Sequence, residues 1–273
     1  MKTLLVTAAL VFVAVSSSAA IQYDFVQKNT TADAVEPTSD LVARAVIDGD
    51  RTRIDFLGGT LYPPGTYVVS TDGSRKLVFV DPIKEWYTEV NTASVATALG
   101  ASNIRITNLK SIMEKRDDRP IIAGHATEHT RLTITYDISV TVKTIPLKQH
   151  VRTEVDTWAT PEFAAAATSS VLSGMRTGNV EIDRMLDVEA TQLKGFPLRQ
   201  TVTTRTAADL PPTRSELQVP TTRTIVREMW VTSIRETAPD ATLFVIPPKY
   251  RRADAQEAPK AAKETLTFEP PAK

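Results

Sequence analysis

The chain has 273 residues, with 32 basic side chains, 32 acidic side chains and no cysteine. This balance excludes the basic field that nucleic-acid-binding proteins present, so we expect no nucleic-acid partner. Without cysteine there is no disulfide framework, and a hydrophobic core must hold the domain together.

The first twenty residues have the pattern of a secretory signal peptide. Lys2 precedes an apolar run over residues 4–15, and the small residues 16–20 follow. The run is too short for a transmembrane helix, which needs about 20 apolar residues. We predict cleavage after Ala20, a periplasmic or secreted mature chain, and no transmembrane span in it. Because Ile21 rather than a cysteine follows, we expect the mature chain to be soluble and without a lipid anchor.

Short strands separated by turns are predicted for most of the chain. Residues 21–40 begin with a possible strand and continue as a polar segment, and a β meander starts at Leu41. Asp72-Gly73 is the strongest hairpin signal in the meander. Strands at this spacing are typical of antiparallel sheets. The segment 251–273 is rich in Ala, Lys, Glu and Pro and is predicted to be a disordered tail. We therefore predict a single domain over residues 41–250.

The alternation is clearest over residues 131–142. Leu132, Ile134 and Tyr136 point to one face, and Arg131 and Thr133 point to the other. This period of two indicates a strand with one apolar face.

Three short helices are predicted between the strands. They cover residues 92–99, 161–173 and 180–194. Thr160-Pro161 gives the second helix a capping residue and a proline at its first position. The third helix is amphipathic, and its apolar face includes Met185 and Leu186.

One motif deserves comparison with a metal site. His125-Ala126-Thr127-Glu128-His129 matches the H-x-x-E-H pattern of some zinc peptidases. That chemistry needs a helix, because only there can both imidazoles reach one zinc; on a strand the two residues sit about 13 Å apart. The residues that follow alternate as a strand, so a solvated strand face is the favoured interpretation.

Trp86, Trp158 and Trp230 each fall on a predicted strand. Core packing is the simpler interpretation. A curved sheet with a large apolar concave face could instead use them to line a cavity.

Two short motifs stand out late in the chain, Gly195-Phe196-Pro197-Leu198 and Leu243-Phe244-Val245-Ile246-Pro247. With the order of predicted elements over residues 40–250, they resemble uncharacterised secreted bacterial proteins with a LolA/LppX-like lipoprotein-carrier fold. The resemblance implies a mainly β (α+β) fold: a strongly curved antiparallel sheet forming an unclosed half-barrel, with the three helices capping its concave side. Relatives of this fold hold acyl chains of lipids or lipoproteins there. The family gives no functional residue to carry over.

From this resemblance we expect a non-catalytic periplasmic carrier or binding protein for an amphipathic ligand, a lipid or the acyl chain of a lipoprotein. We expect no cofactor and no metal. The residues expected to line the cavity or its lid are Trp86, Leu132, Ile134, Tyr136, Trp158, Met185, Leu186 and Trp230. One alternative is an envelope protein-interaction module with a filled core. A more remote one is a zinc hydrolase that uses His125, Glu128 and His129.

Overall fold

A computed structural model describes residues 20–31, 39–91, 104–142, 145–167, 180, 183–184, 187, 194–209 and 222–253. The predicted signal peptide lies outside these residues except for Ala20, and so does most of the predicted tail. Cleavage after Ala20 and disorder of the tail therefore stay predictions. No helix among the described residues is long and apolar enough to cross a membrane.

Twelve strands form one sheet in the order β14-β6-β5-β4-β3-β2-β1-β13-β12-β11-β10-β7. Their bounds are β1 Ala20–Thr31, β2 Ser39–Asp48, β3 Arg51–Gly59, β4 Tyr67–Ser70, β5 Lys76–Asp81, β6 Trp86–Asn91, β7 Ile104–Arg116, β10 Glu128–Val142, β11 Ile145–Thr160, β12 Phe196–Asp209, β13 Thr222–Thr237 and β14 Arg251–Arg252. Neighbouring strands are antiparallel except β14 and β6. A separate hairpin, β8 (Ile121–Ile122) and β9 (His125–Ala126), lies between β7 and β10 in the chain.

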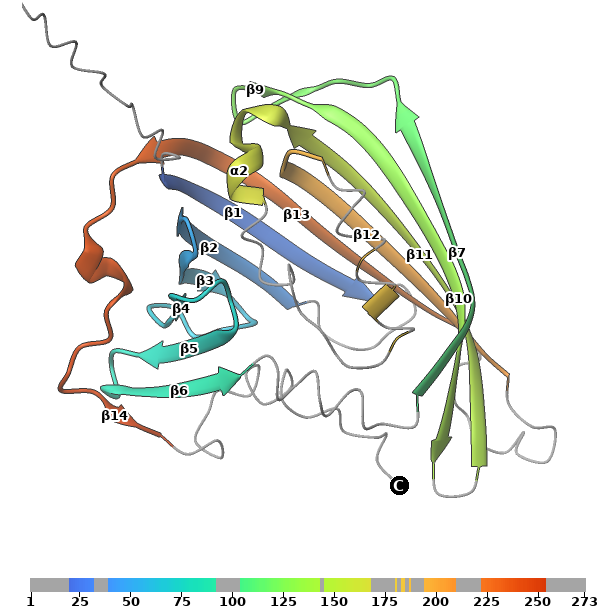
Figure 1. Ribbon diagram of the computed structural model, residues 1–273, viewed down its shortest axis with the longest axis horizontal. Helices are drawn as coiled ribbons and strands as arrows, with labels where there is room; N and C mark the ends of the chain where they lie inside the picture. The colour runs from blue at the N-terminus through green and yellow to red at the C-terminus, as the bar shows by residue number, and fades with distance from the viewer. Residues whose placement is uncertain are drawn as a thin grey trace, which may run out of the picture.

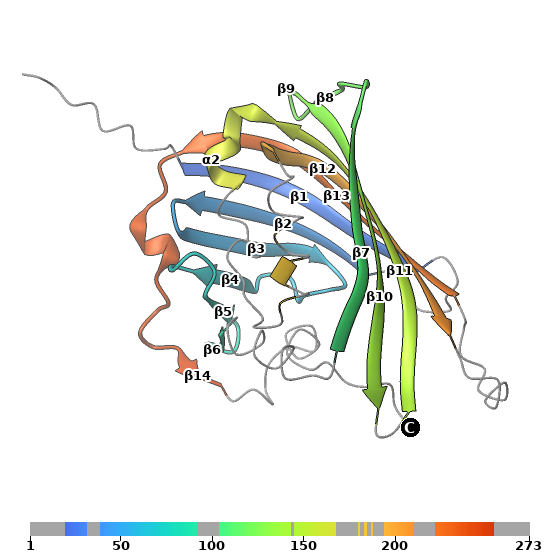
Figure 2. The same ribbon diagram turned by 45° about the vertical axis from the view of Figure 1, so that its right-hand side comes forward.

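The sheet curves strongly around one side. Figures 1 and 2 show it bending around the side on which α2 lies, with β7 at one end and β6 and β14 at the other. Among the described strands these two ends do not pair, so the sheet is unclosed, as predicted. We call the side that carries Phe25, Leu132 and Leu198 the inner face, and the side that carries Arg131 and Trp158 the outer face.

The predicted half-barrel with three capping helices is wrong in its helices. Most of the described chain is strand, and the α-helix whose bounds are described is α2 (Ala164–Ala167), one turn after the 3-10 helix η1 (Pro161–Phe163). The predicted start is correct, because the Thr160 hydroxyl accepts a hydrogen bond from the Glu162 backbone N–H. The alanines that follow favour helix but offer little side chain to bury, and isolated helices shorter than about 12–15 residues are marginal.

The other two predicted helices cannot be compared residue by residue. Residues 92–99 lie outside the described part of the chain, and of 180–194 only residues 180, 183, 184, 187 and 194 are described. Among the strands, β11 and β13 are the longest described, with 16 residues each.

Apolar clusters pack on both faces of the sheet. The inner-face cluster includes Phe25, Phe56 and Leu198, and Phe163 and Ala166 from η1 and α2 pack against it. Because η1 and α2 sit on this cluster, they cover one end of the inner face.

The second cluster lies on the outer face of β2, β4 and β5. There Phe244 of η3 (Ala241–Phe244) packs on Val46, Tyr67, Val69, Val78 and Val80. The segment 240–252 thus crosses the outer face, and its end pairs with β6 as β14. At the other end of the chain, β1 lies between β2 and β13. The division into one domain with a separate tail stays a prediction.

Candidate functional site

A row of apolar side chains crosses the inner face from the β7 edge of the sheet. Cross-strand pairing places Met113 of β7 opposite Leu132 of β10, Leu132 opposite Val155 of β11, and Val155 opposite Val202 of β12. On β13 the row continues with Arg227. Because neighbouring strands lie about 4.8 Å apart, the four apolar positions span about 15 Å. We call these five residues the inner row; it is an apolar track with a cation at one end.

The middle of the inner row is buried. Leu132 and Val155 are 2% and 1% exposed and form a cluster with Ile134, separate from the larger inner-face cluster. The side chains that pack against this cluster are Leu109, Tyr136 and Val202. A ligand that binds along the inner row would have to displace the atoms that cover Leu132 and Val155.

The ends of the track are open to solvent. Met113 is 38% exposed, and Ile225, on the inner face two residues before Arg227, is 37% exposed. Arg227 is itself exposed. Within the described part of the chain it forms no ion pair or hydrogen bond through its side chain. The inner face therefore presents apolar surface at its margins, together with a cation that has no partner among the described residues.

Strand register decides which face each predicted site residue occupies. The residues on the inner face are Trp86, Leu132, Ile134 and Tyr136. Leu132, Ile134 and Tyr136 lie together in one cluster, whereas Trp86 is on β6, at the other end of the sheet. Met185 and Leu186 lie outside the described residues. The part that any of these residues plays in binding stays a prediction.

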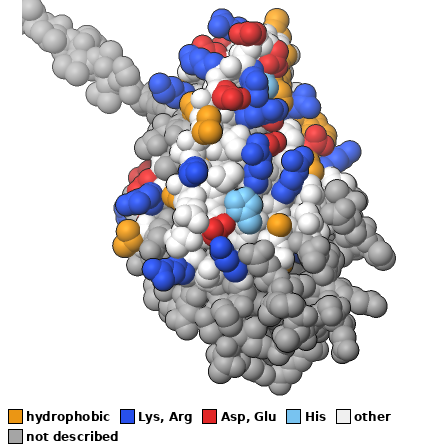
Figure 3. All heavy atoms as spheres, turned by 90° about the vertical axis from the view of Figure 1, so that its right-hand side faces the viewer, with side chains coloured by type: hydrophobic (Ala, Val, Ile, Leu, Met, Phe, Trp, Pro, Cys, Tyr) orange, Lys and Arg blue, Asp and Glu red, His pale blue; other side chains and the backbone are white. Residues whose placement is uncertain are grey.

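The other two predicted residues, Trp158 and Trp230, lie on the outer face. Trp158 is paired with His129 and with Arg199, and Arg199 is paired with Trp230, so the four form one cross-strand row. The Trp158 ring stacks on His129 at 4.1 Å, Arg199 lies 4.8 Å from the Trp158 ring, and Lys28 lies 5.6 Å from Trp230. Figure 3, which faces the side of β7, β10 and β11, shows basic and acidic side chains mixed over the surface.

The H-x-x-E-H motif does not form a metal site. His125 lies in β9 and His129 in β10, so the helix that the zinc chemistry requires is not present. The Nδ1 atom of His125 lies 2.7 Å from Glu162 Oε2, and His129 contacts two other carboxylates. Among the described residues no group of three His, Cys, Asp or Glu side chains is placed to hold a metal ion.

His129 instead belongs to an ionic cluster on the outer face. Its Nδ1 lies 2.5 Å from Asp118 Oδ1 and its Nε2 lies 2.9 Å from Asp156 Oδ1. Arg131 donates two hydrogen bonds to Asp156, at 2.8 and 2.9 Å, and Trp158 donates one to Asp118 at 2.9 Å. Hydrogen bonds from His129 and Trp158 lower the pKa of Asp118. Burial raises the pKa of Asp156, but the hydrogen bonds from Arg131 and His129 outweigh it and lower that pKa.

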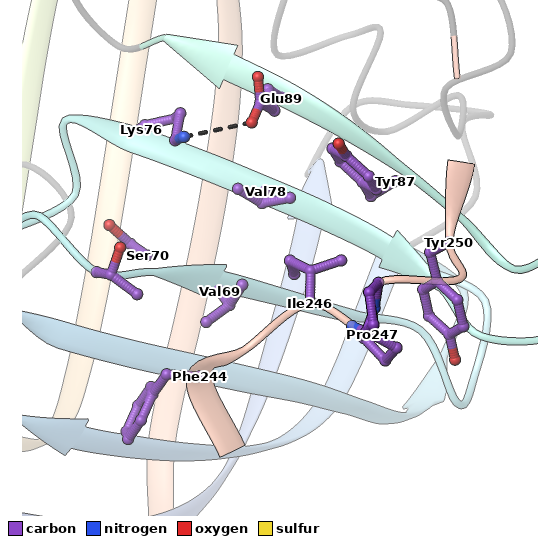
Figure 4. Close-up of a pocket in the computed structure, with 12 residues that line it drawn as sticks. Val69, Ser70, Lys76, Val78, Tyr87, Glu89, Phe244, Ile246, Pro247 and Tyr250 are labelled. Carbon is purple, nitrogen blue, oxygen red and sulfur yellow. Dashed lines mark hydrogen bonds and ion pairs between the residues drawn. The ribbon is translucent and has the colours of Figure 1, made fainter. Parts of the chain in front are cut away.

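A shallow groove of about 250 Å³ lies on the outer face, between β4–β6 and the segment 240–252. Figure 4 shows Phe244, Ile246 and Tyr250 of that segment facing the strands, and the ion pair between Lys76 and Glu89 at 3.2 Å. The groove is the seam where the segment packs, and the two charged side chains of its lining, Lys76 and Glu89, are paired with each other.

The comparison with solved structures gives a similarity of fold. No protein-family model matches the sequence, and no curated protein matches it. Among solved structures the chain is similar to a LolA superfamily protein from Nitrosomonas europaea, with 8% identity over 83% of this chain and 90% of that chain and a TM-score of 0.32. The family named from the sequence is thus also found among solved structures, but at this TM-score the match carries no argument on its own.

The sequence analysis did not identify Arg227 or the ionic cluster around His129 as features of a site. On β13, Ile225 and Met229 alternate with Arg227 on one face while Val226 and Trp230 occupy the other, so hydrophobic pattern alone does not identify the inner face. Arg227 is assigned to the inner face by its pairing with Val202 on β12, and the pairing of Val231 with Phe25 on β1 agrees.

Proposed function

We propose that the protein is a carrier or binding protein for an amphipathic ligand, a lipid or the acyl chain of a lipoprotein, and that it acts outside the cytoplasm without catalysis. The observation that carries the proposal is the inner row: four apolar positions on adjacent strands, ending in Arg227. An acyl chain laid across the strands would contact the apolar positions, and its anionic head would meet the guanidinium.

The expected affinity follows from the length of the row. About ten methylene groups buried along it would contribute about 8 kcal/mol. Association costs about 4 kcal/mol or more, and a charge-assisted hydrogen bond to Arg227 adds about 2 kcal/mol. The net of about 6 kcal/mol does not include the cost of displacing the atoms that cover Leu132 and Val155, so it sets the tightest dissociation constant expected, at some tens of micromolar.

The test is a calorimetric titration of the delipidated mature protein with dodecanoate and with dodecanol. Saturable binding of dodecanoate is expected, and Arg227→Gln should weaken it roughly tenfold while leaving the neutral alcohol unaffected. Arg205→Gln removes an exposed cation from the outer face and is the matched control.

A second pair of variants tests the face. Ile225→Glu places a charge on the inner face and should weaken binding of both probes, whereas Val226→Glu changes the next residue on the outer face and should not. Mass spectrometry of an organic extract from periplasmically expressed protein would name the natural ligand. No saturable binding of either probe up to about 1 mM would contradict the proposal.

The second candidate function is an envelope protein-interaction module with a filled core. The observation in its favour is the near-complete burial of Leu132, Ile134 and Val155, at 3% exposure or less. This candidate predicts an empty lipid extract and no probe binding, so the same titration separates the two.

A further inference from the structure

The two edge strands of the sheet differ in whether a further segment of the chain pairs with them. At one end the chain covers its own edge, because β14 pairs with β6 and the backbone N–H groups of Arg251 and Ala253 donate to the carbonyl groups of Glu85 and Tyr87. At the other end, β7 pairs with β10 and with no other strand among those described. An edge strand presents a line of free N–H and C=O groups that a further strand can pair with.

The β7 edge is long and exposed on both faces. It has 13 residues. A bulge at Asn108, whose φ is 56°, and Leu109 interrupts it, and its pairing with β10 is continuous from Lys110 to Arg116. In that half, Ile112 on the outer face and Met113 on the inner face are 61% and 38% exposed. An extended segment beside β7 would cover both.

The charge of the strand selects the kind of partner. β7 contains four cationic residues, Arg105, Lys110, Lys115 and Arg116, against the single acid Glu114. Glu114 is paired with Arg116 at 2.8 Å, and Lys110 and Lys115 are both exposed. Like charges on neighbouring strands destabilise pairing, so a second copy of β7 is disfavoured, whereas a strand with carboxylates opposite the two lysines is favoured.

We propose that the free edge of β7, over Leu109–Arg116, binds an extended acidic peptide segment of a partner protein by strand addition. Backbone hydrogen bonds would supply part of the affinity, and the acidic side chains would supply the selectivity. A residue opposite Met113 would also continue the inner face of the sheet. The proposal does not depend on the ligand of the inner row.

Lys110 lies on the outer face and Lys115, five residues later, on the inner face. The experiment therefore uses the mature protein and a fluorescent ten-residue peptide of valine and threonine that carries two glutamates five residues apart, so that one carboxylate can lie opposite each lysine. Binding is followed by anisotropy at low salt, with hydrogen exchange of residues 109–116 as the structural readout. Charge reversal by Lys110→Glu with Lys115→Glu should weaken binding roughly tenfold or more. Lys28→Glu with Arg205→Glu makes the same change in net charge on interior strands and should leave the affinity within about twofold.

Two further peptides separate strand addition from simple charge attraction. A peptide N-methylated at alternate residues keeps every charge but loses the N–H donors of one edge, and one with lysine in place of glutamate keeps the donors but reverses the charge. The lysine peptide should bind at least roughly tenfold more weakly, and so should the N-methylated peptide in the one methylation frame that blocks the edge facing β7. Undiminished binding of the N-methylated peptides in both methylation frames would overturn the proposal, as would no binding of the glutamate peptide or a stable dimer of the protein paired through β7.

Discussion

The ionic cluster around Asp156 gives the sharpest test of the energetics. The Asp156 carboxylate accepts hydrogen bonds from Arg131 at 2.8 and 2.9 Å and contacts His129 at 2.9 Å. Its side chain is 14% exposed, that of His129 is 8% exposed, and that of Arg131 is 36% exposed. We expect Asp156→Asn to lower the free energy of unfolding at pH 7 by about 2 kcal/mol, less than the 3–5 kcal/mol of a fully buried pair because solvent screens Arg131.

The pH dependence fixes the sign of this effect. The folded-state pKa of Asp156 is lowered, so the cluster stabilises the fold above the unfolded-state pKa of about 3.9 and loses that contribution as the pH falls through the folded-state pKa. The difference between the wild type and Asp156→Asn should therefore be largest near neutral pH and clearly smaller at about pH 2.5.

Urea unfolding at both pH values measures the two differences. Glu154→Gln is the matched control on the same strand and face, because its partner Arg152 is 48% exposed and the pair should contribute less than about 0.5 kcal/mol. A destabilisation by Asp156→Asn no larger than that of Glu154→Gln, or one equally large at pH 2.5, would refute this account of the cluster.

Three other changes test the fold. Gly59→Ala should lower the free energy of unfolding by about 3 kcal/mol, because its φ is 103° and an added Cβ would lie 2.3 Å from a backbone oxygen. Gly49→Ala, where φ is 58° and the surrounding space is open, should lower it by about 1 kcal/mol. Leu198→Ala should lower the free energy of unfolding by about 3 kcal/mol, because Leu198 is 0% exposed. Leu57→Ala should lower it by less than about 1 kcal/mol, because Leu57 is 49% exposed. Urea unfolding measures the glycine pair and the leucine pair. Burial raises the pKa of Tyr23 to about 12, so its neutral form stabilises the fold until the pH rises through that range, and Tyr23→Phe should raise the midpoint of alkaline unfolding in ultraviolet titrations.

The sequence predicted local features of the fold well. The alternation over 131–142 puts Leu132 and Ile134 on one face and Arg131 on the other, as the register of β10 and β11 confirms. A period of two is enough to show that two faces exist and which residues share one. The capping pair Thr160-Pro161 likewise starts a helical turn where it was predicted.

Features that depend on pairing between distant segments could not be predicted in this way. Phe244 packs on the outer face of strands more than 160 residues earlier, and Asp118 reaches His129 from a loop. Arg227 is assigned to the inner face by the pairing of its strand with β12 and β1. A hydrophobic pattern records the faces of one strand but not the register of the next. For the helix predicted to begin at Pro161, the capping pair predicts the start but not the extent, since the α-helix described there, α2, has four residues.

The position of the tryptophans provides the last test of the binding proposal. Trp158 and Trp230 were predicted to line the ligand site, but the register places them on the outer face, opposite the inner row. With Trp86→Phe as the background, only these two tryptophans emit. If dodecanoate binds along the inner row, their emission maximum and their quenching by iodide should not change on saturation, because the thickness of the sheet separates them from the ligand. A blue shift, or protection from iodide, would mean that the ligand sits on the outer face, and the assignment of the inner row would then be wrong.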